Sequence, residues 1–167
     1  MTNSIVQTSA GTTISISAVL PATDDAAGYA ALTWAVIGEV TDLGEFGREY
    51  ATVTHNPVAS RRTIKRKGSY NDGTMALQLA LDRDDAGQIL VKTALGSDAN
   101  QAIRLTYQDG SKDYFSAMVM SFKTNVGSVD QILSGSINLE INTDIIPVAG
   151  IKNNGFYTIV EVYAIVT

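Results

Sequence analysis

Apolar and polar residues alternate with a period of two along much of the chain. In residues 74–82 every second position, from Met75 to Leu81, carries a large apolar side chain. Successive side chains of a β-strand point to opposite faces, so this pattern predicts a strand with one buried and one wetter face. The same alternation, or a high content of β-branched residues, predicts further strands at residues 12–20, 32–40, 103–107, 114–122 and 136–142. The strand at 114–122 is apolar on both faces, so we expect both to be covered.

Turn-forming residues separate several of these predicted strands. Asp109-Gly110 stands between two strand patterns and is a strong hairpin signal. Asn71-Asp72-Gly73 directly precedes the strand that begins at residue 74. In the same way, Asn153-Asn154-Gly155 precedes a last predicted strand at residues 156–166.

One helix is predicted, at residues 84–95. Asp82 or Asp84 can cap its N-terminus, where acidic residues also suit the helix dipole. Gly96 ends the helix, and Gly87 weakens it by about 1 kcal/mol relative to alanine. A helix this short is marginal alone, so we expect it to pack on a sheet. The apolar stripe expected to make that contact consists of Ala86, Ile89, Leu90, Ala94 and Leu95.

Residues 54–73 do not fit the alternating pattern, because they are polar and basic, with Pro57 near their start. A connection of about 20 residues inside a compact domain is usually functional or disordered, so we expect a long loop here. The order of elements predicts a mainly β fold with one α-helix, a β-sandwich or half-barrel. The chain length suits one domain, placed at residues 1–148, and a short extension at 149–167 with an edge strand.

The charge of the chain is unevenly distributed. Five of its 12 basic residues lie at positions 61–67, and the remaining 7 stand against 17 acidic residues, a balance of −10. The basic run has three interpretations: a solvated loop, a nucleic-acid contact, or an arm that docks on the acidic body of a neighbouring copy. A single-strand nucleic-acid site usually interleaves aromatic side chains with the basic ones, and only Tyr70 is present.

The residues that most catalytic and metal sites need are scarce. The chain has no cysteine, which excludes disulfides and thiolate metal sites, and its one histidine, His55, has no partner that suggests a triad. The acidic residues at 82–85 and Asp24-Asp25 can bind a hard cation, but a helix N-terminus and a surface loop explain them more simply. We therefore expect neither an enzyme nor a cofactor. We also expect no secretory signal and no membrane span, which needs about 20 apolar residues.

Several weak motifs occur in an order that is more informative than any one of them. Together they span residues 11–147: Gly11-Thr12-Thr13, Trp34, Val40-Thr41-Asp42-Leu43-Gly44, Lys67-Gly68, Asp72-Gly73-Thr74, Asp84-Asp85-Ala86-Gly87-Gln88, Asp109-Gly110-Ser111, the strands at 115–121 and 135–142, and Pro147. In this order and spacing the chain resembles the tail tube, or major tail, proteins of long-tailed, non-contractile bacteriophages, the family typified by the lambda tail tube subunit. Many relatives end near residue 147 or carry an immunoglobulin-like domain, for which the remaining 20 residues are too few.

The resemblance implies a structural role in the virion tail, for a protein made in the cytoplasm of the host bacterium. Proteins of this family form hexameric rings whose inner sheets join edge to edge into a β-barrel around a lumen. The rings stack on a tape-measure protein into a hollow tube that conducts viral DNA without binding it specifically. Tail terminator and tail tip proteins are the other expected partners.

Two groups of residues become candidates through this resemblance. The long loop is expected to contact the neighbouring subunit or the next ring through Val58, Arg61, Arg62, Ile64, Lys65, Arg66, Lys67 and Tyr70. A conduit should repel DNA, so an acidic lumen is expected. The candidate lumen residues, which an ordinary solvated outer face explains equally well, are Glu39, Asp42, Glu45 and Glu49.

Two other functions remain open from the sequence. The first is the inner tube of a contractile tail or of a secretion apparatus, which shares the ring fold and adds a sheath partner. The second is a β-sandwich module that binds a carbohydrate or a cell surface, which needs an exposed aromatic platform. The aromatic cluster available for such a platform is Phe156, Tyr157 and Tyr163.

Overall fold

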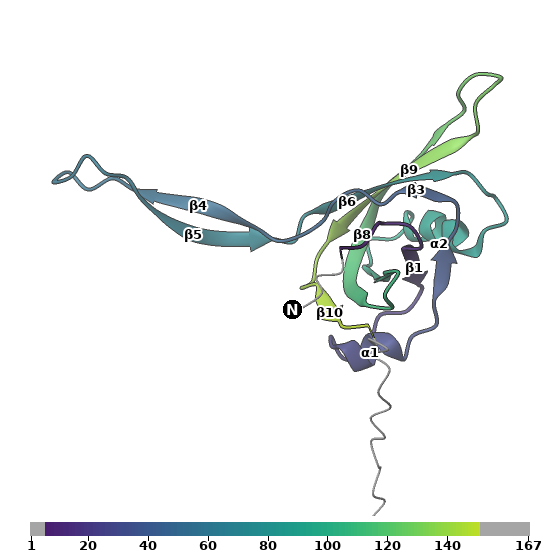
Figure 1. Cartoon of the computed structure of the whole chain (residues 1–167), viewed down its shortest axis with the longest axis horizontal. Helices are drawn as coiled ribbons and strands as arrows, with labels where there is room; N and C mark the ends of the chain where they lie inside the picture. Colours follow the sequence, from purple (N-terminus) through teal and green to yellow (C-terminus); the bar gives the residue numbers. More distant parts are fainter. Residues whose placement is uncertain (1–5, 151–167) are drawn as a thin grey trace, which may run out of the picture.

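The chain folds into a body made of one curled antiparallel sheet and an arm that projects from it (Figure 1). The computed structural model describes residues 6–150. Strands in the body follow the order β2-β1-β7-β8-β9-β6-β3, and β10 pairs with β8. The elements are β1 Thr13–Ser17, α1 Ala26–Ala30, β2 Ala35–Ile37, β3 Val40–Asp42, β4 Glu49–His55, β5 Ile64–Asn71, β6 Thr74–Ala80, α2 Ala86–Ala94, β7 Gln101–Thr106, β8 Lys112–Asn125, β9 Ser134–Ile141 and β10 Ile146–Val148.

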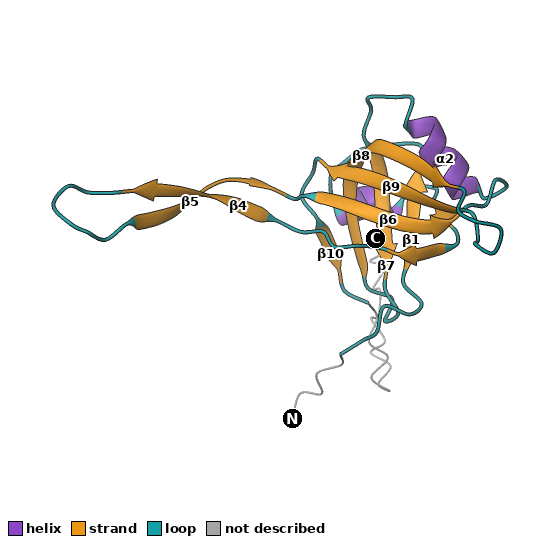
Figure 2. Cartoon of the chain, turned by 90° about the horizontal axis from the view of Figure 1, so that it is seen from above, coloured by secondary structure: helices purple, strands orange, loops and turns teal. Residues whose placement is uncertain are grey.

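The alternating strands place their apolar faces in one core, as the sequence predicts. In β6 the side chains of Met75, Leu77 and Leu79 are buried, and in β9 those of Ile137 and Leu139. The two strands pair in antiparallel register, with Leu77 opposite Ile137, so their apolar faces coincide. Strands β1, β7 and β8 add further buried residues to the same cluster. The predicted mainly β fold is therefore confirmed, and Figure 2 shows the sheet curling around this core.

A second, smaller cluster lies on the other face of β7 and β8. It contains Tyr29 of α1, Ala102 and Tyr114, and the rings of Tyr29 and Tyr114 stack with their centroids 5.4 Å apart. The first half of β8 is thus covered on both faces, as expected. The second half is not, because β8 continues into an exposed hairpin with β9, where Met120 is 54% exposed.

Two corrections concern the number and the capping of the helices. Residues 6–150 contain two helices rather than one. The additional helix, α1, is short, and Asp25 caps it by accepting a hydrogen bond from the Gly28 amide at 2.7 Å. The second, α2, begins at Ala86 and is capped by Asp85, which accepts from the Gln88 amide at 2.7 Å. Asp82 and Asp84 do not cap α2; instead the Asp82 carboxylate accepts from the Asp84 amide in the preceding turn.

The face that α2 turns to the sheet also differs from the predicted stripe. Of the predicted stripe, Ala94 is buried and Leu90 packs against the core, but Ile89 is 46% and Leu95 is 40% exposed. Gly87, Gln88 and Val91, which were not predicted, are buried instead. Gly87 determines this rotation, because it lies so close to β2 that a β-carbon there would be 2.3 Å from the Val36 carbonyl oxygen.

Gln88 is the polar residue that this rotation buries, and its amide is fully used. Its Nε2 donates to the carbonyl oxygens of Gly38 at 3.3 Å and Ala80 at 3.0 Å, while its Oε1 accepts from the Asp82 amide at 3.1 Å. Burial of a polar side chain is favourable only when it is hydrogen-bonded in this way. Gln88 thereby fixes α2 to the ends of β2 and β6.

The prediction of one long loop at residues 54–73 is wrong, because half of this segment is strand. β5 covers residues 64–71 and pairs with β4 in a separate two-stranded sheet. Both faces of this hairpin are exposed, so its strands lack the one-sided apolar alternation that identifies the strands of the body. The strand predicted at residues 156–166 lies outside the described residues.

Candidate assembly interface

The most distinctive surface is the hairpin at residues 49–71, called the arm from here on. Its strands β4 and β5 pair only with each other among the described strands, and the arm extends away from the body (Figures 1 and 2). In the register Tyr50 lies opposite Tyr70 and His55 opposite Ile64, with a bulge after Tyr50. An isolated two-stranded hairpin is only marginally stable in water. The arm is therefore an element suited to being covered by a partner.

The arm brings together all eight residues predicted for the long loop. Val58, Arg61 and Arg62 lie at its tip, and the other five lie on β5. All eight are exposed. Cross-strand partners share a face, so Lys65 and Lys67 project on one side with Thr52 and Thr54. Arg66 projects on the other side, which Val53 and Ile64 make more apolar. That these residues touch another subunit remains a prediction.

A set of interlocked side chains fixes the base of the arm. The Arg48 guanidinium donates to both carboxylate oxygens of Asp72, at 2.8 and 3.2 Å, and also to Asp144. Asp72 is only 6% exposed, and these hydrogen bonds raise the pKa of Arg48, with Asp72 as the main cause. Arg48 also lies 4.0 Å above the Tyr70 ring, whose centroid is 5.5 Å from that of Tyr50. These contacts hold the first turn of the arm against the body.

The cluster at the base of the arm could not be predicted from the sequence. Asp72 lies 24 positions after Arg48 in the chain, and Asp144 lies 96 positions after it. Only the fold brings the three side chains together. Asp72 was assigned to a turn, which it does occupy, but the turn motif gives no sign of a buried ion pair.

The four acidic candidates lie in a line along one border of the body, called the acidic edge from here on. The carbonyl of Glu39 accepts from the Ala80 amide, Asp42 lies opposite Gln78, and Glu49 lies opposite Asn71, so the line follows β6 from end to end. Glu45 lies between them and lines a groove with Glu49. All four are exposed. The structure spreads these residues along one border of the sheet, with only Glu45 and Glu49 lining the same groove, and it does not test whether they face a lumen.

The turn at Glu39 is strained. Its φ is +56°, and it is the only residue other than glycine with a positive φ in the part of the chain that the structure describes. Side chains rarely adopt this left-handed conformation. Here the hydrogen bonds of Gln88 and Ala80 to the carbonyls of Gly38 and Glu39 hold the turn in place.

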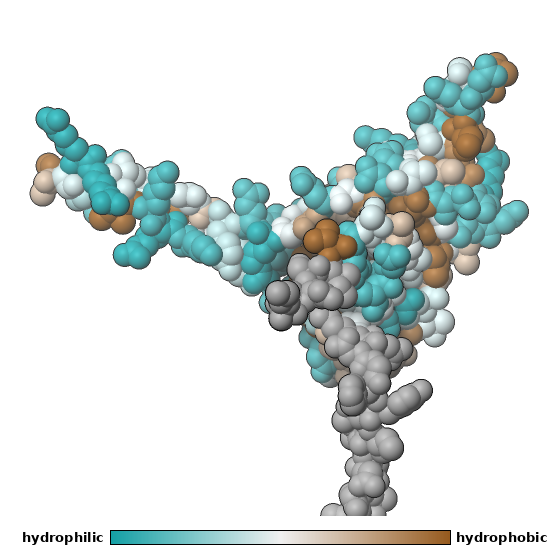
Figure 3. Space-filling view, viewed as in Figure 1, coloured by the Kyte–Doolittle hydropathy of each residue, from teal (hydrophilic) through white to brown (hydrophobic). Residues whose placement is uncertain are grey.

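The hairpin between β8 and β9 carries a second exposed surface, which the sequence did not indicate. Val126, Val129 and Ile132 in its loop are 67%, 100% and 80% exposed. Figure 3 shows brown, apolar residues at this tip, on the side of the body away from the arm. The β6–β9 pairing explains this separation, because the arm leads into Thr74 and the β8–β9 loop leads into Ser134 opposite Ala80. The arm and the apolar loop therefore lie at opposite ends of the same strand pair.

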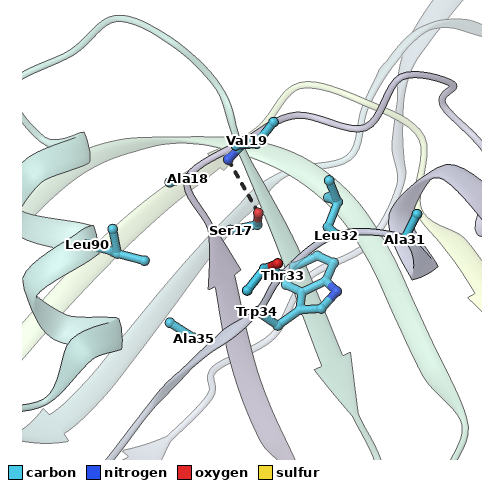
Figure 4. A pocket seen from close by; sticks show the side chains of 9 residues that line it. All are labelled: Ser17, Ala18, Val19, Ala31, Leu32, Thr33, Trp34, Ala35 and Leu90. Atoms are coloured by element: carbon cyan, nitrogen blue, oxygen red, sulfur yellow. Dashed lines mark hydrogen bonds between the residues drawn. The ribbon is translucent and has the colours of Figure 1, made fainter.

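A pocket of about 390 Å³ lies between α2, β1 and the segment before β2 (Figure 4). It is lined mainly by apolar side chains, among them Val19, Leu32, Trp34 and Leu90. The hydroxyl of Ser17 accepts a hydrogen bond from the Val19 amide. Among the described residues, no histidine or carboxylate lines this pocket beside Ser17 to act as the base that a serine nucleophile needs.

Within residues 6–150, no three histidine or acidic side chains are placed to hold a metal ion together. In that same part of the chain, neither helix has the length and apolar character to cross a membrane.

The family comparison identifies the class of protein to which this fold belongs. Residues 2–150 match the family model described as phage tail tube protein, TTP, so the chain belongs to that family. It is accordingly a structural tube subunit and a component of the tail of a phage particle, as the sequence resemblance implied. No curated protein matches the chain.

Solved structures with the same fold come from several tail-like assemblies. The chain is similar to a subunit in the tail of an empty gene transfer agent particle (TM-score 0.64, 11% identity, 86% of this chain and 100% of that one). It is also similar to a chain of the anti-feeding prophage baseplate (0.63, 13%, 91% and 99%) and to the SPP1 tail tube protein (0.59, 15%, 81% and 75%). At these identities the likeness shows a shared fold and nothing finer.

Proposed function

We propose that the chain is the tube subunit of a sheathless, long-tailed phage, and that rings of six copies stack into a hollow tube that conducts viral DNA. The ring number is supported by the sixfold symmetry reported for the gene transfer agent tail and the anti-feeding prophage baseplate, whose subunits share the fold. A tape-measure protein, a tail terminator and tail tip proteins are the partners that such a tube requires.

The observation that carries this proposal is the arm. A basic, two-stranded hairpin exposed on both faces gains stability when a partner covers it. Strands β2 and β3 stand at the two ends of the strand order, and each has one unpaired side among the described strands. Unpaired edges expose hydrogen-bonding groups that invite another chain. In a ring, a heterologous contact repeated around an axis pairs every edge with the next copy.

The charge of the body suits a conduit. Without the five cations of the arm, the chain has a balance of −10. A negatively charged lumen wall repels the phosphate backbone of DNA, whereas a basic wall would hold DNA by counterion release. No chemistry is required of such a wall, and we propose that the chain has no catalytic role.

A second candidate is the inner tube of a contractile system. The chain is similar to a subunit of an extracellular contractile injection system, a PVC sheath–tube complex in the extended state (TM-score 0.58, 12% identity, 89% of this chain and 94% of that one). Electron micrographs of the native particle separate the two candidates, since a sheath around the tube would favour the contractile system.

Neutralising the arm tests the role in assembly. Replacing Arg61, Arg62, Lys65, Arg66 and Lys67 together by glutamine should block tube growth, while circular dichroism shows a folded monomer. All five are changed because one exposed ion pair contributes only about 0–1 kcal/mol. The matched control replaces body cations, namely Arg83, Lys92, Lys112 and Lys123. Normal tubes from the arm variant, seen by electron microscopy, would contradict the proposal.

A further inference from the structure

The arm and the acidic edge carry opposite charges that form no ion pairs within the described part of one copy, although the Lys67 ammonium lies 4.3 Å from the centre of the Tyr50 ring. Inside residues 6–150, the only ion pairs are those of Arg48 with Asp72 and Asp144. The five cations at 61–67 therefore have no carboxylate partner there, and the four carboxylates of the acidic edge have no cationic one. Charged side chains left in this state on two separate surfaces are available to a partner.

The charged part of the arm is shorter than the acidic edge. The eight residues of β5 span about 25 Å at the usual strand rise of about 3.3 Å per residue. The acidic edge runs from the level of Ala80 to that of Asn71, which corresponds to about 30 Å. The three cations of β5, Lys65, Arg66 and Lys67, occupy only about 7 Å of that strand, so they can meet the carboxylates of one part of the acidic edge. A side-by-side contact can bring several opposite charges together at once.

The contact cannot form within one copy, because the arm starts at the end of the acidic edge and leads away from it. Glu49 belongs to both, and from there the arm projects from the body on the side opposite β3 and α2 (Figure 1). The contacts of Arg48 with Asp72 and Tyr70 hold the base of the arm in that direction. The cations of the arm can therefore reach an acidic edge only on another molecule.

We infer that the arm of one copy lies along the acidic edge of a second copy, so that Lys65 and Lys67 pair with the carboxylates around Glu45 and Glu49. The inference rests on the proposed function, and it names the partner surface for the arm. Because the donor and acceptor surfaces differ, the contact is heterologous and can be repeated from copy to copy. Among the described strands the outer backbone edge of β3 is unpaired; it lies between Glu39 and Asp42, farther along the acidic edge, and can receive an arm strand by β-addition.

This contact gives the four acidic residues a role other than lining the lumen. A carboxylate that is covered by an arm is not exposed to passing DNA. The lumen interpretation is therefore the competing outcome of the experiments that follow.

Charge reversal with a matched control tests the contact. The variant Glu45→Lys with Glu49→Lys should lower the yield of sedimentable tubes at least tenfold. The control, Asp98→Lys with Asp130→Lys, makes the same change at two exposed body positions and should assemble like the unchanged chain. Adding Lys65→Glu and Lys67→Glu to the edge variant exchanges the two signs and should restore tubes. Circular dichroism of the unassembled variants checks that each is folded.

Cysteine cross-linking tests the contact without altering most of its charges. The chain has no cysteine, so an engineered pair reports only its own proximity. A chain with Lys65→Cys and Glu45→Cys, assembled under reducing conditions and then oxidised with copper phenanthroline, should give a ladder of covalent multimers. Chains with either substitution alone, or with Lys65→Cys and Asp98→Cys, should not give this ladder.

The outcomes separate the inference from the function on which it rests. If the unchanged chain forms no rings or tubes, the proposed function itself fails. If it forms tubes but the edge variant also assembles normally and the Lys65–Glu45 pair gives no ladder, only the inference is overturned. In that case, fluorescent duplex DNA retained by tubes of the edge variant would assign these carboxylates to the lumen.

Discussion

Gly87 shows how a residue that weakens an isolated helix can be required by the packing of that helix. A β-carbon there would lie 2.3 Å from the Val36 carbonyl oxygen and 2.6 Å from the Ile37 α-carbon, both of which are backbone atoms. Alanine gains about 1 kcal/mol in helix propensity, but the clash forces α2 away from β2. We predict that Gly87→Ala lowers the free energy of unfolding by about 1–3 kcal/mol, measured by urea denaturation.

Gly96 provides the control for that substitution. A β-carbon there would have its nearest contact, the Thr93 carbonyl oxygen, at 3.5 Å, which is an ordinary separation. Gly96→Ala should therefore change the free energy of unfolding by less than about 1 kcal/mol. A Gly87→Ala protein that is more stable than the unchanged chain would show that α2 is free to shift.

Tyr107 should make stability depend on alkaline pH. Burial is the main cause that raises the pKa of its phenol, and the hydrogen bond that it donates to Asp113 raises it further. A raised pKa means that the folded state favours the neutral phenol. Its contribution is complete below the unfolded pKa of about 10 and is lost as the pH rises beyond it. We predict that unfolding begins above about pH 10, followed by absorbance at 295 nm and circular dichroism.

Two variants separate the causes of this pH dependence. Tyr107→Phe removes the ionisable group and should reduce the loss of stability above about pH 10. Asp113→Asn removes the neighbouring charge but leaves the phenol half-buried, so its effect should be smaller. If Tyr107→Phe and the unchanged chain lose stability in parallel, then Tyr107 does not contribute.

Among the elements, those with one face in the core could be predicted from the sequence. β6 and β9 could be identified because the face of each strand that packs in the core carries apolar residues, and the opposite face carries mostly small or polar ones. The arm has water on both faces, so no alternation marks β4 and β5, and their basic residues suggested a loop. The short helix α1 was missed because one turn is too short for a helical period and its buried residue, Tyr29, is held by Tyr114 from a distant strand.

The candidate site was predictable in its residues but not in its geometry. The basic run is visible in the sequence, yet only the fold shows that Lys65, Arg66 and Lys67 lie on a strand while Arg61 and Arg62 lie at the tip of the arm. Four carboxylates spread over 11 positions give no sign that they follow one border of β6, which depends on the pairing of Asp42 with Gln78. Long-range pairing of this kind is the information that local patterns lack.

The exposure of the arm leads to a prediction about proteolysis. Trypsin cleaves after arginine and lysine, and both arginines at the tip of the arm, Arg61 and Arg62, are exposed. We predict that the unassembled chain is cut first at this tip, giving two fragments that mass spectrometry can assign. In tubes the same bonds should be cut at least tenfold more slowly, since a neighbour covers them. Equal rates in both forms would mean that the tip stays outside the interface.

At the scale of the whole molecule, the fold and the capacity for assembly reside in different parts of the chain. Neither hydrophobic cluster includes a residue of the arm. The arm begins and ends at one pair of opposed residues, Glu49 and Asn71, and Arg48 and Asp72 form their ion pair just outside it. The body therefore contains the whole hydrophobic core, and it also contains the ion pair that holds the base of the arm.

This separation allows the arm to be removed in one step. Replacing residues 50–70 by Asn-Gly leaves Glu49 and Asn71 as the pair that flanks a two-residue turn, which is a favoured hairpin geometry. We predict that the shortened chain unfolds within about 5 °C of the full chain, because it loses almost no core, and that it forms no tubes. Calorimetry measures the first effect and negative-stain microscopy the second.

An unfolded product would make the arm part of the fold, whereas tubes of normal length would assign assembly to the β2 and β3 edges alone. A folded product without tubes would show that this chain polymerises through an element that its own fold does not need.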